Sequence, residues 1–328
     1  MLGDQLGCCS EMFGKFGSCG TGVYAHPAEV WRLAPCPTRE DLVLTLHSTA
    51  GAGRQATVWR LPAADAAAAA GALQAAESVA ALPPAAKVAG HLESVLWSSD
   101  QTGLSLATTE EECLSVWSLD KGDAQCATKG RATAAITAAC WDPHSADRLL
   151  SCSGGGLHSW DLRAAEAPTV LTASAHAGAA HAVDCNPNKA HQALTAGVDG
   201  LIKCWDVRKP AEPLLTLQGH SHWIWGARYN PDHDQLLVSA SSDHTVRLWG
   251  ASSISSEPLA PNDEDSEGSQ PEEVEQNDGE LECFGCHADS VYSVAWSAAD
   301  AFVLASVSHD GQLAVNHVCP QEKNRILL

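Results

Sequence analysis

Alternating hydrophobic and polar positions divide most of this chain into short segments of the β type. Several of these segments end in a tryptophan, as in ATVWRL, LSVWSL, LHSWDL, IKCWDV and VRLWGA, at Trp59, Trp117, Trp160, Trp205 and Trp249. The steps between these tryptophans are 58, 43, 45 and 44 residues. A further segment, LAVNHV, places Asn316 where the next tryptophan is expected, 67 residues after Trp249. A period near 44 residues is typical of the four-stranded blade of a β-propeller.

Other residue types recur in the same register. About twenty positions before the recurring tryptophans stands an aromatic residue or its substitute, at Trp97, Trp141, Cys185, Tyr229 and Trp296. A histidine column contains His26, His176, His220 and His287. Tight-turn signals fall between the segments, as at Asp199-Gly200 and Asp310-Gly311, with Asp243-His244 as a variant. Because these columns share one period, the sequence predicts an all-β propeller.

Six blades can be recognised within residues 23–328. Residues 1–22 show no blade pattern and are predicted to form an irregular N-terminal segment, so the ring has either six blades or seven blades with an incomplete first blade. Two insertions interrupt the repeats. Residues 63–86 are rich in alanine and are predicted to form a loose or partly helical connector. Residues 257–282 contain 11 acidic residues and no Lys or Arg, which predicts a solvated loop; its use as a docking segment for a basic partner stays open.

The repeating residues resemble the WD40 family, and the resemblance implies a hydrogen-bonded tetrad inside a blade. One tetrad would join His220, Ser239, Asp243 and Trp249, and a second would join His176, Thr195, Asp199 and Trp205. A less complete set contains His287, Ser306 and Asp310, with Asn316 in place of the tryptophan. Such polar groups can satisfy one another away from water. Because the Ser/Thr-His-Asp arrangement recurs from blade to blade, we interpret it as structural and not as a catalytic triad.

The repeat leaves three tryptophans unexplained, namely Trp31, Trp223 and Trp225. Trp31 and Trp225 belong to a further column, Trp31, Glu93, Thr137, His181, Trp225 and Tyr292, each preceded by an apolar residue. These preceding residues are predicted to lie in the core, at Val30, Leu92, Ile136, Ala180, Ile224 and Val291. Strand alternation then turns Trp31, Trp223, Trp225 and Tyr292 away from it, toward the mouth of the ring or a neighbouring blade. They are candidates for a protein interface, and packing between blades is the alternative.

Composition narrows the possible functions. The chain has 40 Asp plus Glu against 19 Lys plus Arg, a net charge of -21, so nucleic acid is not an expected ligand. No run of apolar residues approaches the length of a membrane span, and direct membrane insertion is not expected. The string Cys283-Phe284-Gly285-Cys286-His287 matches a haem-attachment pattern, but His287 already belongs to the histidine column. No catalytic residues, cofactor site or metal site are predicted.

The C-terminal half carries a more specific resemblance. The stretches GHSHWIWGARYNPDHDQLLVSASSD and SISSEP, the acidic insertion, HADSVYSVAWSAAD and the terminal ILL are similar to the family of WD40 proteins that interact with the EARP and GARP complexes. The resemblance covers roughly residues 23–328. Members of that family begin with additional N-terminal blade sequence, so the resemblance implies a seven-blade ring with an incomplete first blade. It implies a non-catalytic, monomeric adaptor that binds these vesicle-tethering complexes in endosomal recycling and retrograde transport to the trans-Golgi network. The same resemblance implies a cytoplasmic protein that associates peripherally with endosomes and the trans-Golgi network.

A second functional hypothesis comes from two short strings. Trp160-Asp161-Leu162-Arg163 and Trp205-Asp206-Val207-Arg208 resemble motifs of WD40 substrate receptors of cullin–RING ubiquitin ligases. In those receptors the arginine helps to contact the ligase adaptor, a role that would fall here to Arg163 and Arg208. Substrate receptor of such a ligase is therefore the alternative function.

Overall fold

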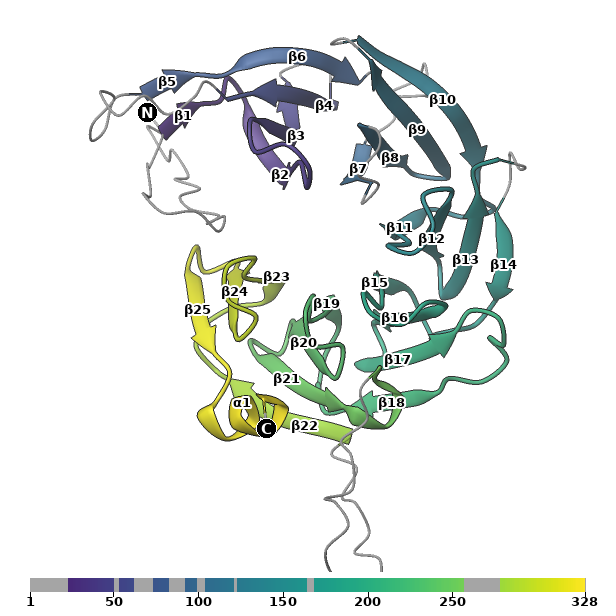
Figure 1. Ribbon diagram of the computed structural model, residues 1–328, viewed down its shortest axis with the longest axis vertical. Helices are drawn as coiled ribbons and strands as arrows, with labels where there is room; N and C mark the ends of the chain where they lie inside the picture. The colour runs from purple at the N-terminus through teal and green to yellow at the C-terminus, as the bar shows by residue number, and fades with distance from the viewer. Residues whose placement is uncertain are drawn as a thin grey trace, which may run out of the picture.

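A computed structural model describes residues 23–49, 53–61, 73–82, 92–98, 104–120, 123–163, 168–256 and 278–327. Six antiparallel sheets follow one another around a ring, with the chain running from sheet to sheet in sequence order (Figure 1). Five of these sheets have four strands and the last has three. The predicted all-β propeller with six recognisable blades is confirmed.

The first three blades contain the following strands. Blade 1 consists of β2 (Glu29–Pro35), β3 (Leu42–Thr49), β4 (Gly53–Arg60) and β6 (Glu77–Leu82). Blade 2 consists of β7 (Leu92–Trp97), β8 (Ser105–Glu110), β9 (Cys113–Asp120) and β10 (Asp123–Arg131). Blade 3 consists of β11 (Ile136–Trp141), β12 (Arg148–Ser153), β13 (Gly156–Asp161) and β14 (Thr169–Thr172).

The last three blades continue in the same way. Blade 4 consists of β15 (Ala180–Cys185), β16 (Gln192–Gly197), β17 (Leu201–Asp206) and β18 (Leu215–Gln218). Blade 5 consists of β19 (Ile224–Tyr229), β20 (Leu236–Ser241), β21 (Val246–Ala251) and β22 (Asp278–Phe284), with a short 3-10 helix, η1 (Ser252–Ile254), after β21. Blade 6 consists of β23 (Val291–Trp296), β24 (Val303–Ser308) and β25 (Leu313–His317), and α1 (Pro320–Leu327) follows it.

The first strand of each blade lies innermost in the ring and the last lies toward the outside (Figure 1). The recurring tryptophans lie on the third strand of blades 1 to 5, and Trp249 is almost completely buried. Apolar side chains of successive blades form shared clusters; one such cluster combines Ile202 and Leu217 of blade 4 with Ile224 and Leu237 of blade 5. The repeated tryptophans and apolar columns therefore seal one sheet against the next.

Both predicted insertions need correction. Residues 77–82, within the predicted connector 63–86, form β6, the fourth strand of blade 1. Ala80 and Leu82 are buried there, because small and apolar residues at alternate positions can cover a sheet edge as well as form a helix. Residues 278–282, within the predicted acidic loop 257–282, begin β22, whose Glu280 and Glu282 pair along β21. Residues 257–277 and most of 63–76 lie outside the described residues, although Leu73–Ala75 forms β5, which pairs in parallel with β1 (Val23–Ala25).

The first and last blades each show an exposed apolar surface. The predicted core column is buried in blades 2 to 6, but Val30 of blade 1 is 36% exposed. In blade 6, Leu313 and Val315 on β25 are 58% and 55% exposed, and β25 has no neighbour other than β24 among the described strands. No described sheet covers these two surfaces, which is why the core prediction is wrong for Val30. A seventh blade stays a prediction, and the predicted irregular segment 1–22 lies outside the described residues.

Candidate functional site

Every inner strand carries a β-bulge near its start. The pairing register skips one residue in each blade, and the skipped residues are Trp31, Glu93, Thr137, His181, Trp225 and Tyr292. We call these six residues the bulge ring, because the blades repeat and so bring them to the same end of each inner strand. A bulge bends its strand and re-aims the side chain of the extra residue. Strand alternation alone did not reveal this device, although a column of mixed residue types next to a strictly apolar column was its signal.

Four aromatic residues predicted as an interface lie in or beside the bulge ring. Trp31, Trp223 and Tyr292 are 51%, 45% and 45% exposed, respectively. Trp223 precedes β19 and lies edge-on to Trp225, with 5.9 Å between the ring centroids. Tyr292 lies 4.8 Å from the ring of His309 in the same blade. Large aromatic side chains that keep about half of their surface in solvent are typical anchors of protein interfaces.

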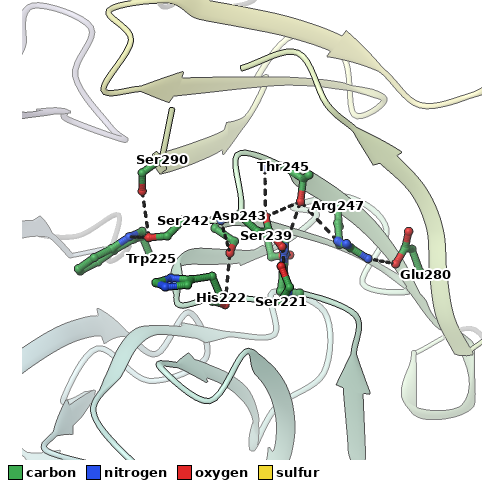
Figure 2. A network of polar contacts seen from close by, with 12 residues as sticks. Ser221, His222, Trp225, Ser239, Ser242, Asp243, Thr245, Arg247, Glu280 and Ser290 are labelled. Carbon is green, nitrogen blue, oxygen red and sulfur yellow. Dashed lines mark hydrogen bonds and ion pairs between the residues drawn. The ribbon is translucent and has the colours of Figure 1, made fainter. Parts of the chain in front are cut away.

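Trp225 differs from the other three because it also packs between blades. Its ring stacks on His181 of blade 4 at a centroid distance of 4.6 Å, and only part of its surface reaches solvent. Its indole Nε1 donates a hydrogen bond of 2.6 Å to Ser242 Oγ (Figure 2). Ser290 of the last blade donates to the same hydroxyl at 3.0 Å. Trp225 therefore joins blade 4 to blade 5 and, through Ser242, to blade 6.

Trp31 lies in a separate cluster on blades 1 and 2. Its indole Nε1 donates a hydrogen bond to Ser48 Oγ, and the Arg54 guanidinium lies over its ring, 4.5 Å from the centroid. Arg54 also forms an ion pair of 3.2 Å with Glu93, another member of the bulge ring. The cation–π contact and the ion pair hold this exposed indole in a defined orientation.

The structure brings together all four members of the first predicted tetrad. Ser239 Oγ accepts a hydrogen bond from the Trp249 indole at 2.8 Å and lies 2.7 Å from His220 Nε2. The other imidazole nitrogen lies 2.8 Å from a carboxylate oxygen of Asp243, and Thr245 donates a further hydrogen bond to Asp243 (Figure 2). Burial alone would raise the pKa of Asp243, but the hydrogen bonds from His220 and Thr245 outweigh it and lower this pKa well below its ordinary value.

The second tetrad has the same geometry. His176 lies 2.8 Å from Asp199 and 2.8 Å from Thr195, and the Trp205 indole donates to Thr195 at 2.9 Å. Burial lowers the pKa of His176 in spite of the neighbouring Asp199 carboxylate. In blade 6 His287 bonds Ser306 at 2.8 Å, whereas His287 Nδ1 lies 3.6 Å from Asp310 and makes no hydrogen bond in the described structure.

The geometry of these networks indicates a structural and not a catalytic role. Ser239 and Thr195 are completely buried, and each hydroxyl is already engaged by an imidazole and an indole. A nucleophilic hydroxyl must be accessible to a substrate carbon, and neither hydroxyl is. Within the described residues, no group of three or more His, Cys, Asp or Glu side chains is placed to hold a metal ion.

Arg163 and Arg208 occupy equivalent positions in blades 3 and 4. Each guanidinium forms an ion pair with the aspartate two residues earlier, Asp161 at 3.1 Å and Asp206 at 2.8 Å. Both arginines are exposed to solvent. The hydrogen bond from Arg208 is the main cause that lowers the pKa of Asp206 to about 2. The two arginines therefore lie in fixed, repeated positions, away from the bulge ring in sequence and in strand position.

Radial antiparallel sheets, with tryptophan-anchored Ser/Thr-His-Asp networks inside blades 4 and 5, define a β-propeller of the WD40 class. A model of the WD domain, G-beta repeat, matches residues 279–315. The model of the EIPR1 beta-propeller matches residues 17–249, which is more than half of the chain. The chain therefore belongs to the EIPR1 β-propeller family.

Individual relatives agree with this assignment. The rat protein named EARP and GARP complex-interacting protein 1 is 31% identical over 332 residues, which cover 93% of this chain and 85% of the rat protein. The Danio rerio protein named EARP-interacting protein homolog is 33% identical over 333 residues, with the same two coverages of 93% and 85%. The Arabidopsis thaliana WD repeat-containing protein DWA2 is 29% identical over 305 residues, covering 91% of this chain and 82% of that protein. No helix of the described residues is long and apolar enough to cross a membrane.

Proposed function

We propose that this chain is a non-catalytic adaptor that binds vesicle-tethering complexes of the EARP and GARP type. The observation that carries the proposal is its membership of a family whose relatives are named for interaction with these complexes, at 30% identity or more over most of the chain. The corresponding process is endosomal recycling and retrograde transport to the trans-Golgi network. We expect a monomeric propeller in the cytoplasm that associates peripherally with endosomes and the trans-Golgi network.

The surface proposed to bind the partner contains Trp31 and Tyr292 of the bulge ring and Trp223, which lies against Trp225. Trp31, Trp223 and Tyr292 combine large apolar area with partial exposure and little freedom to rotate, since each contacts a second ring or a guanidinium. Rigid aromatic side chains lose little conformational entropy on binding, and they supply most of the binding energy at many interfaces.

Affinity purification tests the proposal. The tagged wild-type chain should recover subunits of the tethering complexes. A Trp223→Ala, Tyr292→Ala variant should recover about tenfold less of these subunits, as expected for interface anchors. The matched control is Val170→Ala with Leu214→Ala, because these side chains are also large, apolar and about half exposed but lie on or next to outer strands. Thermal unfolding of both variants should match wild type. Failure of wild type to recover any tethering subunit would refute the function.

The alternative, a substrate receptor of a cullin–RING ubiquitin ligase, has one observation in its favour. Arg163 and Arg208 are exposed and are held in equivalent positions by their own aspartates. Recovery of a ligase adaptor that is lost in an Arg163→Ala, Arg208→Ala variant and retained in an Arg39→Ala variant would favour this function over the adaptor role.

A further inference from the structure

Two cysteine side chains meet where blades 3 and 4 join. Cys140 lies on β11 and Cys185 lies on β15, the inner strands of these two neighbouring blades (Figure 1). Their Sγ atoms are 3.4 Å apart, although the two residues are separated by 45 positions in the chain. The two thiols are therefore in direct contact across the junction of the blades.

The same pair of positions makes a contact at other blade junctions. Cys140 is the second-last residue of its inner strand, and Cys185 is the last residue of the next inner strand. The corresponding residues at blades 1 and 2 are Ala34 and Trp97, and at blades 4 and 5 they are Asp184 and Tyr229. Hydrogen bonds of 2.8 Å and 3.0 Å join these two pairs. The arrangement of inner strands around the ring therefore holds these positions together, and cysteine occupies both of them only where blades 3 and 4 join.

The thiol pair lies in an apolar cluster at the inner strands, where it packs with residues such as Leu150 and Trp205. Cys140 and Cys185 are 6% and 8% exposed, whereas Cys152 in the same cluster is completely buried. A molecule about the size of water can therefore touch the pair. The hydrogen bond with Cys140 and burial raise the pKa of Cys185 well above its ordinary value, so this thiol stays protonated and reacts slowly.

We propose that Cys140 and Cys185 form a dithiol that hydrogen peroxide converts into a disulfide between blades 3 and 4. Peroxide oxidises one thiol to a sulfenic acid and releases one molecule of water. The second thiol attacks the sulfenic sulfur, so that the S–S bond forms and the S–O bond breaks. The hydroxide leaves with the thiol proton as a second molecule of water. The two cysteines lose two electrons in total, and the peroxide gains them.

Contact between the thiols determines how the oxidation ends. A sulfenic acid without a nearby thiol is open to further oxidation, to a sulfinic and then a sulfonic acid. Here the second thiol already touches the first, so it captures the sulfenic acid before another peroxide molecule arrives. The resulting disulfide closes a loop across 45 positions of the chain. It restricts the unfolded chain and therefore stabilises the folded ring.

Peptide mapping of the full chain tests the proposal. The reduced chain is treated with hydrogen peroxide and then unfolded with N-ethylmaleimide, and the monomer fraction is digested with trypsin without reductant. Cleavage at Lys and Arg places Cys140, Cys152 and Cys185 in the separate peptides 132–148, 149–163 and 164–189. We expect the first and third of these peptides to be recovered as one linked species, lighter than their sum by two hydrogen atoms.

Thermal unfolding measures the effect of the link on the ring. Oxidation should raise the unfolding temperature of the wild-type chain by about 3 °C or more relative to its reduced form. Cys140→Ala and Cys185→Ala should each lose this rise, when each oxidised variant is compared with its own reduced form. The matched control is Cys204→Ala, which removes another buried thiol of blade 4. This control should keep both the linked peptides and the rise.

Three outcomes would overturn the proposal. Recovery of Cys140 and Cys185 only as N-ethylmaleimide adducts, after peroxide has oxidised the exposed Cys126, would show that the pair does not react. A link between peptides 132–148 and 149–163 would make Cys152 the partner of Cys140. A sulfinic or sulfonic acid at either cysteine in place of the link, or a link that lowers the unfolding temperature, would show that the ring does not hold the two sulfur atoms in position.

Discussion

The Ser239 hydroxyl is the acceptor on which the blade 5 tetrad depends. It accepts a hydrogen bond from the Trp249 indole and bonds the His220 imidazole, and water does not reach it. A buried donor that loses its hydrogen-bond partner is left with its full desolvation penalty. The Ser239 hydroxyl therefore stabilises the fold mainly by pairing with the indole and the imidazole. The same dependence holds for Thr195 in blade 4.

Replacing Ser239 by alanine should lower the free energy of unfolding by about 2–3 kcal/mol, because the Trp249 N–H and one His220 nitrogen lose their partner. Urea denaturation of the purified protein measures this change. Ser221→Ala serves as the control, since the Ser221 side chain is exposed and only its backbone N–H bonds Asp243. A decrease in the free energy of unfolding below about 0.5 kcal/mol, the range of ordinary surface substitutions, would show that the tetrad does not stabilise the blade.

The free energy of unfolding should decrease in two steps as the pH is lowered. Burial lowers the pKa of His47, His158, His176 and His181, so the unfolded chain takes up these protons first, and stability falls as the pH drops below about 6.5. The pKa values of Asp199 and Asp243 are lowered in the folded state, by hydrogen bonds that outweigh the opposite effect of burial. Their contribution is present above about pH 3.9 and is lost below it.

Urea denaturation between pH 7.5 and 3 measures both steps. The first step should shrink in His176→Gln, which removes one of the buried imidazoles. The part of the second step that belongs to Asp199 should shrink too, because His176 is the main cause that lowers this pKa, whereas the part that belongs to Asp243 should remain. A free energy of unfolding that stays constant between pH 7.5 and 5 would contradict the assignment of buried, neutral histidines.

At the scale of elements, the β-bulge decides what each inner strand presents to solvent. It places one residue per blade out of register, so that a core residue such as Ile224 and a partly exposed residue such as Trp225 can be direct neighbours. The bulge also allows contacts across blades: Trp225 stacks on His181, and Thr137 donates a hydrogen bond to the Ala180 carbonyl of blade 4. One structural device therefore serves both the exposed face and the packing of blades.

The neighbouring tryptophans 223 and 225 should respond differently to substitution. Trp225→Ala should lower the free energy of unfolding by about 2 kcal/mol, because a half-buried indole and its contact with His181 are lost. Trp223→Ala should change it by less than about 0.5 kcal/mol. Chemical denaturation of the single variants checks both values, and a double-mutant cycle with His181→Ala should show coupling only for Trp225. Equal losses for both tryptophans would assign Trp223 to packing as well.

At the scale of the whole molecule, the ring exposes apolar surface where blades 1 and 6 end. Leu313 and Val315 occupy the columns of Val246 and Leu248, which are completely buried in blade 5. Val30 and Leu33 are the corresponding exposed residues on β2. An edge strand with exposed apolar residues is prone to pair with other chains.

Charged residues on this edge should reduce self-association. At concentrations high enough for the monomeric wild-type chain to begin to self-associate, Leu313→Lys with Val315→Lys should lower the associated fraction, since charged side chains disfavour pairing at an edge. Sedimentation velocity at several concentrations measures this effect. The control variant, Val170→Lys with Leu214→Lys, changes equally exposed apolar residues outside β25 and should leave self-association unchanged. A large drop in the unfolding temperature would instead place Leu313 and Val315 in the folded core.

The sequence predicted the fold and the tetrads well because both depend on residues that recur every blade. The histidine, hydroxyl, aspartate and tryptophan of one tetrad lie within about thirty residues of each other, and a repeated column reveals them without coordinates. The strand β6 was not predicted, since the alanine-rich segment around it suits a helix as well as a sheet edge. Helix α1 was also missed, because it lies beyond the last blade and shows no repeat.

The sequence alone determined the repeat and the all-β propeller, because hydrophobic alternation and the spacing of indoles are local properties, and its resemblance to known WD40 proteins indicated the family. Only the tertiary structure decided which of the aromatic residues in or beside the bulge ring pack against another blade. Trp225 differs from Trp223 through its contact with His181, which lies on another blade. Such proximity follows from the order of blades around the ring, and no pattern within one blade contains it.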